Sequence, residues 1–263
     1  MKKLVLAVAA AAAFSGSAVA ADLAARPYTK APPPVAPAVS WTGCYLGAGG
    51  GGGFYVQEEQ NVTVATGLPN NVRLDQGGRG WLATVQGGCD YQFPGLGSGI
   101  VIGAFADGDW TNIRGQHTGQ NGAVGLIAAE SKIDWSWAVG GRAGILITPN
   151  LLTYFSAGYT EAHVNGLQYV NFAGAFTGLG LNSQRYQGWF IGAGDEYALG
   201  FLPGLFWKTE YRFADYGTND VPVITTATGL PTATSERTHL YTHTVRSELV
   251  YRFNWGGPVV AKY

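Results

Sequence analysis

The sequence of 263 residues is poor in charge: Asp, Glu, Lys and Arg make up 13% of it, about half of the usual ~25%. Its 16 basic and 17 acidic residues leave a formal net charge of −1, so there is no basic excess with which to bind nucleic acid. After the N-terminal segment no run of eighteen apolar residues occurs, which excludes a membrane-spanning helix there. A Gly-x-Ser-x-Gly motif is also absent, and no enzyme activity is expected.

Glycine and aromatic residues, by contrast, are abundant. Gly occurs 40 times and Phe, Trp and Tyr make up 13% of the chain. Glycine is a poor helix former, so this composition argues against a helical bundle. The many rings argue against disorder, because a chain with so much apolar surface can build a packed structure. We therefore expect an all-β protein.

The first 20 residues have the pattern of a signal peptide. Lys2 and Lys3 precede an apolar run at 4–14, and residues 18–20 form an Ala-x-Ala cleavage site. The alternative, a spanning helix, needs ~17 to 25 residues, and this run is too short. Residues 21–40 follow as a Pro-rich periplasmic tether, which resists incorporation into a sheet. Two interpretations of the tether remain: a spacer that reaches the cell wall, and a linker without a partner.

From Trp41 onward the sequence alternates with period two. In residues 207–213, Trp, Thr, Tyr and Phe occupy the odd positions, and Lys, Glu and Arg the even ones. A strand sends these two sets to opposite faces. The same pattern predicts eight strands, at 43–56, 79–92, 99–110, 134–147, 151–163, 187–199, 205–216 and 241–253.

The connections between these strands alternate between long and short. Three are turn-like, at 94–97, 148–150 and 200–204. Four are long and polar, at 57–78, 111–133, 164–186 and 217–240. Long outer loops and short periplasmic turns are typical of outer-membrane barrels. The sequence thus predicts a single eight-stranded antiparallel up-and-down transmembrane β-barrel over 41–255, with four long extracellular loops, three short periplasmic turns and a short tail at 256–263.

The size of the side chains decides which face meets lipid. A soluble barrel would bury the apolar set, but eight strands enclose too little space for so many rings. The bulky set must therefore face outward, where only lipid accepts it. Rings near strand ends predict an interfacial girdle. Its expected tryptophans are Trp41, Trp110, Trp135, Trp189 and Trp207.

The opposite face carries charges of both signs, which must lie in the lumen. Isolated buried charges are costly, so these groups are expected to pair, with 208–212 facing 246–252 across neighbouring strands. We favour a plug that keeps the interior satisfied over a narrow gated pore. The predicted network contains Arg142, Glu196, Lys208, Glu210, Arg212, Arg246, Glu248 and Arg252, with Asp107 and Asp109 beside it.

The remaining candidates for chemistry are few. Cys44 and Cys89 lie at outward-facing positions on adjacent predicted strands, and the compartment outside the inner membrane is oxidising. A disulfide between them is therefore one prediction, and two free thiols are the other. The six glycines within 47–53 lack a nucleotide-binding spacing and make room for inward side chains. No catalytic, cofactor or metal site is expected. The histidines at 117, 163, 239 and 243 are assigned to solvated loops, with haem or metal capture as the alternative.

Three stretches resemble a known family: residues 41–47, 188–198 and 208–217. They are similar to the Omp25/Omp31 family of alphaproteobacterial outer-membrane proteins, of the OmpA-like β-barrel class. The resemblance covers the leader, the Pro-rich segment and all eight strands, but not the loops. Asp195, at a position usually apolar, and the ten residues after Phe253 depart from the pattern.

The resemblance implies a place in the outer membrane of a Gram-negative cell. Members are described as porin-like or structural surface proteins and surface antigens, and some are said to bind haemin. The implied partners are outer-membrane lipid, lipopolysaccharide and the barrel assembly machinery. We expect a non-enzymatic structural barrel with at most a narrow gated pore; the alternative is a surface protein whose loops bind haemin or a host molecule.

Overall fold

The computed structural model describes residues 39–93, 99–121 and 125–253. The predicted signal peptide, most of the tether, the turn at 94–97 and the tail lie outside the described residues. Among the described residues no helix is long and apolar enough to cross a membrane. Their regular structure consists of ten strands: β1 (Gly43–Thr63), β2 (Leu74–Phe93), β3 (Ile100–Asn121), β4 (Gly125–Thr148), β5 (Leu151–Val164), β6 (Leu167–Asn171), β7 (Phe176–Leu181), β8 (Gln184–Ala198), β9 (Leu205–Thr225) and β10 (Pro231–Phe253).

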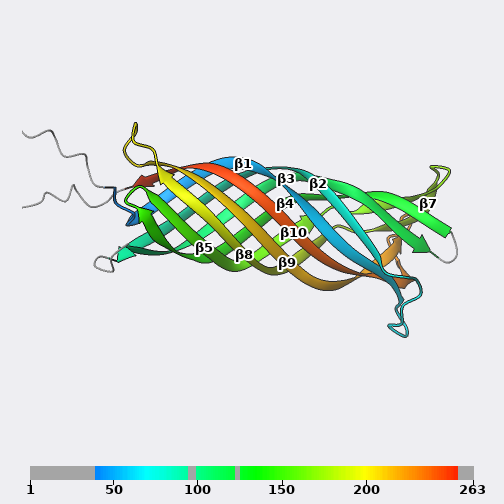
Figure 1. Ribbon diagram of the computed structural model, residues 1–263. Coiled ribbons are helices and arrows are strands. Elements are labelled where there is room, and N and C mark those ends of the chain that lie inside the picture. Colours follow the sequence, from blue (N-terminus) through cyan, green and yellow to red (C-terminus); the bar gives the residue numbers. More distant parts are fainter. Residues whose placement is uncertain (1–38, 94–98, 122–124, 254–263) are drawn as a thin grey trace, which may run out of the picture. The chain divides into compact units, whose positions relative to one another are not determined.

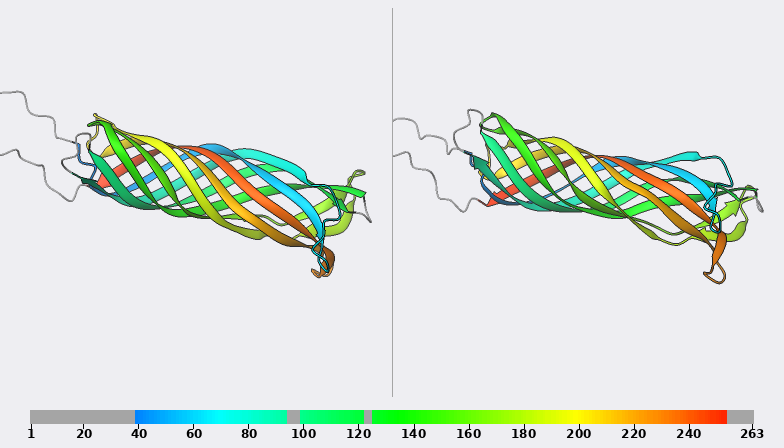
Figure 2. Two further views of the ribbon diagram at one scale, coloured as in Figure 1. Left: turned by 60° about the horizontal axis from the view of Figure 1, so that its bottom comes forward. Right: turned by 90° about the horizontal axis from the view of Figure 1, so that it is seen from below.

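The strands close into one antiparallel barrel, which Figures 1 and 2 show from three sides. Each long strand pairs with its neighbours in the chain, and β10 pairs with both β9 and β1 to close the ring. Closure leaves no unpaired edge, which lipid would not tolerate. β1 begins and β10 ends at the same end of the barrel (Figure 1), and we call this the inner end.

Two of the strands around the barrel are interrupted. β5 and β6 both pair with β4, while β7 and β8 both pair with β9. β5 also pairs with β8, and β6 with β7. The pieces therefore follow one another along two broken strands, and the ring keeps eight strands along its length. The predicted fold class, an all-β antiparallel barrel of eight strands, is confirmed.

The strands run further than their sequence pattern indicated. The connection from β1 to β2 spans 64–73, where 57–78 was predicted, and that from β9 to β10 spans 226–230, where 217–240 was predicted. The extra residues pair in register, for example Glu59 with Thr238. Outside lipid both faces of a strand can be polar, so the hydropathy loses its period of two while the pairing continues. Much of what resembled loop is strand.

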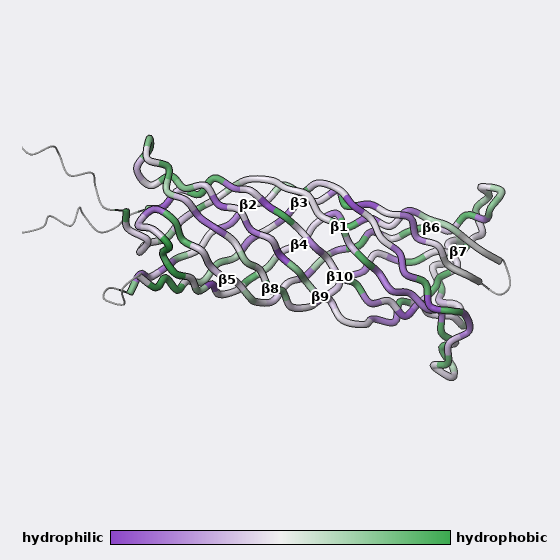
Figure 3. The backbone as a smooth tube through the Cα atoms, viewed as in Figure 1, coloured by the Kyte–Doolittle hydropathy of each residue, from purple (hydrophilic) through white to green (hydrophobic). Residues whose placement is uncertain are grey.

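The two faces of the barrel differ as the alternation requires. Outward rings and aliphatic side chains are exposed, among them Phe155 at 72% and Trp110 at 58%. Hydrophobic and hydrophilic residues follow each other closely along the tube in Figure 3. The glycines of β1 allow close packing on β10, because a Cβ at Gly51 would lie 2.0 Å from the carbonyl oxygen of Val245. Only glycine fits at that position.

Candidate functional site: the charged interior of the barrel

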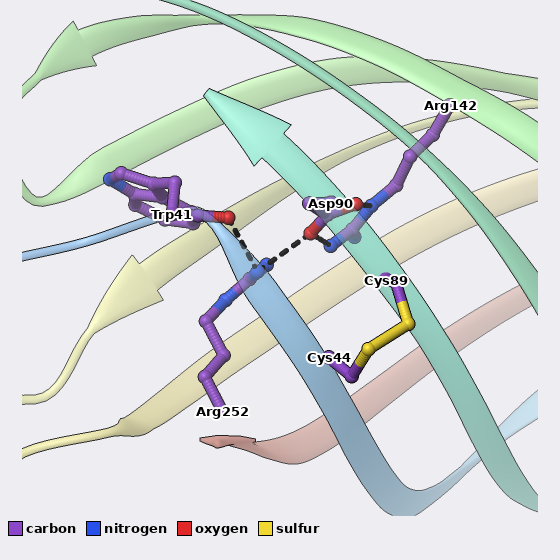
Figure 4. The surroundings of a disulfide bond; sticks show 6 residues. All are labelled: Trp41, Cys44, Cys89, Asp90, Arg142 and Arg252. Carbon is purple, nitrogen blue, oxygen red and sulfur yellow. Dashed lines mark hydrogen bonds and ion pairs between the residues drawn. A yellow bond between two sulfur atoms is a disulfide. The ribbon is translucent and has the colours of Figure 1, made fainter. Parts of the chain in front are cut away.

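Four charged side chains form a closed network near the inner end. Arg142 of β4 donates through Nε (3.0 Å) and Nη2 (2.5 Å) to the carboxylate of Asp90 and through Nη1 to Glu196 (2.9 Å). Arg252 of β10 donates through Nη2 to Glu196 (2.7 Å) and through Nη1 to Asp90 (2.6 Å). Both guanidiniums therefore share both carboxylates, and the set is neutral. Figure 4 shows Asp90 between the two arginines.

The predicted place of Trp41 in the girdle was wrong. Its side chain is fully buried, and its ring lies 4.9 Å from that of Phe206 and 5.0 Å from the Arg252 guanidinium. Its Nε1 donates to the carbonyl oxygen of Pro149 (3.1 Å). Trp41 precedes β1 and is four residues before Tyr45, which points inward. Because side chains alternate along a strand, Trp41 also points inward, into the inner end of the barrel, instead of toward lipid. There it covers the four-residue network.

A second group of ion pairs lies further along the lumen. Lys208 Nζ donates to Glu248 (3.2 Å) and to Gln86 (2.8 Å), and it lies 3.4 Å from Glu210. These residues come from three strands, β9, β10 and β2. As predicted from neighbouring strands, Glu248 stands opposite Lys208 in the register and Arg246 opposite Glu210.

The two remaining lumen arginines hold the aspartates of β3. Arg212 donates to Asp107 through Nη1 (3.0 Å) and Nη2 (2.8 Å). Arg246 donates through Nη2 to Asp109 (2.9 Å). A cavity of about 20 Å³ beside these pairs has room for about one water molecule. The lumen here is packed, and its charges are bound to each other.

Sequence reasoning missed one member and misplaced another. Asp90 was not included in the predicted lumen network. It lies between Cys89 and Tyr91, which point outward, and successive side chains of a strand alternate, so Asp90 points inward. Arg252 was expected to face strand β9, but in the register it stands opposite Tyr45 of β1, and its carboxylate partners are Asp90 and Glu196. In a lumen this narrow, long side chains reach across to strands that are not their neighbours.

Cys44 and Cys89 are joined by a disulfide in the structure. They stand directly opposite each other in the pairing of β1 with β2, with their Cα atoms 3.9 Å apart. Figure 4 places the bond beside Asp90 of the network, which follows Cys89 on β2. It lies at the inner end.

The other predicted girdle residues point outward. Trp110, Trp189 and Trp207 are about half exposed, and Trp135 is partly exposed. Trp110 stands opposite Trp135 in the register, and Trp189 lies toward the same end, whereas Trp207 lies near the inner end. Asp195 also points outward near the inner end and accepts a hydrogen bond from Thr153 (2.6 Å).

Beyond Trp110, Trp135 and Trp189 the outward residues become charged, which marks the end of the apolar band. Examples are Arg114, paired with Glu130 (3.2 Å), and Arg237, whose Nε donates to Asp220 (2.8 Å). We call this part of the barrel the outer extension. It comprises residues 57–76, 112–121, 125–134, 165–187 and 217–239.

The outer extension encloses a polar cluster that the sequence did not reveal. His117, assigned to a solvated loop, is buried inside the barrel, and that assignment was wrong. Its Nε2 lies 3.2 Å from Glu59 and 3.0 Å from Glu236. Burial and the neighbouring Glu236 raise the pKa of Glu59 to about 8. Burial lowers the pKa of His117, but Glu236 outweighs it and holds that pKa above its usual value.

The other histidines lie nearer the surface. His163 Nδ1 is 2.7 Å from Asp134, and His239 Nε2 is 2.8 Å from Asp215. His243 accepts or donates a hydrogen bond with the Tyr211 hydroxyl (2.7 Å). None of these three shares the buried environment of His117.

The strands form a closed antiparallel barrel with aromatic and aliphatic side chains outside and paired charges inside. This arrangement defines an outer-membrane β-barrel. The chain belongs to the family of the 31 kDa outer-membrane immunogenic protein. It is 31% identical over 258 residues to that protein from Brucella melitensis biotype 1, covering 96% of this chain and 100% of the relative. The resemblance stated from the sequence is confirmed, and the protein resides in the outer membrane, surrounded by lipid and lipopolysaccharide.

Other similarities are weaker. The 25 kDa outer-membrane immunogenic protein of Brucella abortus biovar 1 is 26% identical over 254 residues, covering 96% of this chain and 99% of the relative. The crystal structure of OprG from Pseudomonas aeruginosa is similar with a TM-score of 0.49 and 9% identity, covering 82% of this chain and 99% of that one. No family model matches the chain.

Proposed function

We propose that the protein is a non-enzymatic structural component of the outer membrane whose barrel is closed to solutes. The observation that carries this proposal is the network of Asp90, Arg142, Glu196 and Arg252 beneath the Trp41 ring. Each guanidinium already holds both carboxylates, so no unused partner is available there for a gating exchange. The charges keep a polar interior satisfied in lipid.

Conductance measurements test this closure. The refolded protein in a planar bilayer should show no current steps. A variant with Asp90, Arg142, Glu196 and Arg252 all replaced by alanine removes the network without leaving a net charge, and it should admit small ions. Steps from the unaltered protein would overturn the closed barrel and support the narrow pore.

The tether and the assembly route complete the proposal. Residues 21–40 precede β1 in the chain, and a Pro-rich segment of this kind is a semi-rigid spacer that would reach from the barrel toward the cell wall. The barrel assembly machinery is the expected route of insertion. Deleting residues 22–40 while keeping the leader should weaken the envelope against detergent without changing the amount of folded barrel. If the deletion leaves the resistance of the envelope to detergent unchanged, the Pro-rich segment is a linker without a partner.

A second candidate function, ligand binding at the surface, rests on the connections of the outer end. Apolar side chains there are exposed, although single exposed residues are common in any protein. Phe172 and Phe176 are 80% and 75% exposed at the tip between β6 and β7, and Leu68 and Leu230 are 64% exposed at neighbouring connections. Several such tips at one end could together contact haemin or a host molecule.

A matched pair of variants tests this candidate. Phe172→Ser with Phe176→Ser should abolish binding of haemin, or of host proteins, to the refolded barrel. Phe201→Ser is the control, because Phe201 is 78% exposed in the turn at the inner end. Binding that survives the first change, or is lost equally in both, would remove the candidate.

A further inference from the structure

The cluster in the outer extension gathers side chains from four strands. Glu59 comes from β1, His117 from β3, Tyr169 from β6 and Glu236 from β10. Each is 0 to 1% exposed. The cluster lies beyond the apolar band, at the end of the barrel where the segments between the lipid-facing spans are longest, and outer-membrane barrels carry their longer segments on the side that faces the surroundings of the cell.

The distances within the cluster match a metal coordination shell. His117 Nε2 lies 3.2 Å from Glu59 Oε2, 3.0 Å from Glu236 Oε2 and 3.1 Å from the Tyr169 hydroxyl. One imidazole nitrogen can serve only one of these oxygens in a well-aligned hydrogen bond. Ligands bound tetrahedrally to zinc at ~2.0 to 2.2 Å are separated from one another by about 3.3 to 3.6 Å. The ligand atoms of Glu59, His117 and Glu236 all lie within 4.8 Å of one another, so small side-chain shifts would admit an ion between them.

The cluster also has a buried oxygen with no partner. Among the described residues, Glu59 Oε1 is buried and accepts no hydrogen bond. Two carboxyl groups face one imidazole, so a protonated histidine balances the charge of only one of them, and the other must take up a proton or another cation. A buried acceptor without a donor is costly and calls for an explanation. A cation held by both carboxylates provides one.

The neighbours of the cluster orient its ligands. Gln76 Nε2 donates to Glu59 Oε2, and the Tyr169 hydroxyl donates to Glu236 Oε1. Hydrogen bonds of this kind fix the ligands of metal sites in position. The imidazole favours a transition metal, because Ca²⁺ and Mg²⁺ prefer shells made of oxygen alone.

We propose that Glu59, His117 and Glu236 bind one divalent transition metal ion of the Zn²⁺ class inside the outer extension, with Tyr169 beside the open position. The ion would connect β1, β3 and β10 and hold the hairpin of β6 and β7 against them. The site is independent of the lumen network and of the closed state of the barrel.

Zinc titration of the refolded full-length chain, without a histidine tag and freed of metal by a chelator, tests the proposal. Calorimetry near neutral pH should give one Zn²⁺ per chain. His117→Gln and Glu236→Gln should weaken binding by roughly 100-fold or more, because losing even an outer partner of a ligand costs 10- to 100-fold. His239→Gln is the matched control, since it alters an imidazole–carboxylate pair nearer the surface, and it should bind as the unaltered chain does.

Glu59→Gln guards against variants that fail to fold. It keeps the shape and removes one of two adjacent carboxylates, so in chelator it should fold at least as well as the unaltered chain, judged by faster migration of the unboiled protein on a denaturing gel. It should nevertheless lose tight zinc binding. Zinc binding that is equal in the unaltered chain, Glu59→Gln and His117→Gln, or absent from all three, would overturn the proposal.

Discussion

The barrel has two interiors that differ in how their charges are matched. In the part that crosses the membrane, Arg142 and Arg252 are each bound to two carboxylates, and Lys208, Arg212 and Arg246 each have an acidic partner. In the outer extension two glutamates crowd one histidine. The first interior matches each of these cations with a carboxylate, although among the described residues Asp109 Oδ1 and Glu248 Oε2 accept no hydrogen bond, whereas in the second carboxyl groups outnumber their basic partner.

This difference shows that burial and polarity alone do not define a binding site. Both interiors are buried and both contain ionisable groups. In lipid an unmatched charge is too costly, so the membrane part must satisfy itself during folding. The outer extension is surrounded by water and can tolerate an incomplete set that an ion from outside completes. Four predictions can break or sharpen this comparison, beginning with the largest effect.

Replacing Glu196 by Gln should have the largest effect. It leaves Arg142 and Arg252 with Asp90 as their only carboxylate, and breaking a buried pair costs about 3–5 kcal/mol. Urea unfolding of the refolded barrel, followed by gel migration, should show this loss. Arg237→Gln, which breaks an exposed pair with Asp220, should barely move the midpoint because water screens such a pair. Equal losses would refute the idea of a self-satisfied lumen.

Removing the disulfide should have the next largest effect. Cys44 and Cys89 are separated by 45 residues, and cross-links of such length typically stabilise by about 2–4 kcal/mol. Cys89→Ala should lower the unfolding midpoint under oxidising conditions. A reducing agent should produce the same change in the unaltered chain and none in the variant. If the unaltered chain does not respond to reduction, the bond does not contribute.

The outer extension should weaken as the pH rises. The pKa values of Glu59 and His117 are both raised, so the stability from their protonated forms is present at low pH and is lost as the pH rises to about 8 and beyond. The groups that face them are Glu236 of β10, Tyr169 of β6 and Gln76 of β2. In chelator, hydrogen exchange of β6, corrected for intrinsic rates, should be faster at about pH 9 than at pH 6. Glu59→Gln should make the exchange rate of β6 less dependent on pH. An exchange rate that changes with pH as it does in the unaltered chain would contradict the prediction.

The smallest effect concerns the lipid-facing rings. Trp110→Leu keeps an apolar side chain outside and should change the unfolding midpoint little. Trp41→Leu, by contrast, empties space between Phe206 and Arg252 and should cost about 2–4 kcal/mol, as large buried residues do. Urea unfolding of both variants checks this difference. If both substitutions lower the free energy of unfolding equally, Trp41 faces lipid as the other girdle residues do.

The sequence sufficed for the parts where one face of a strand meets lipid. Residues 207–213 alternate so strongly that their two faces could be assigned directly. His117 could not be assigned, because beyond the apolar band both faces are polar. Ile133 and Trp135 show a second obstacle: they are two residues apart, yet Ile133 is buried and Trp135 is partly exposed on the outside, since the pairing shifts between them. The alternation of side chains along a strand also predicts which charged residues point into the lumen. It does not predict which of them pair with each other, as Arg252 shows.

The interruptions at 165–166 and 182–183 have a consequence for variation among related surfaces. The hairpin of β6 and β7 joins the barrel only beyond these breaks, and its tip at 172–175 contributes nothing to the wall in lipid. Residues added or lost at the tip would alter what a neighbouring cell or an antibody meets while the membrane anchor stays unchanged. The molecule thus separates a part that must be inherited faithfully from a part that is free to diversify.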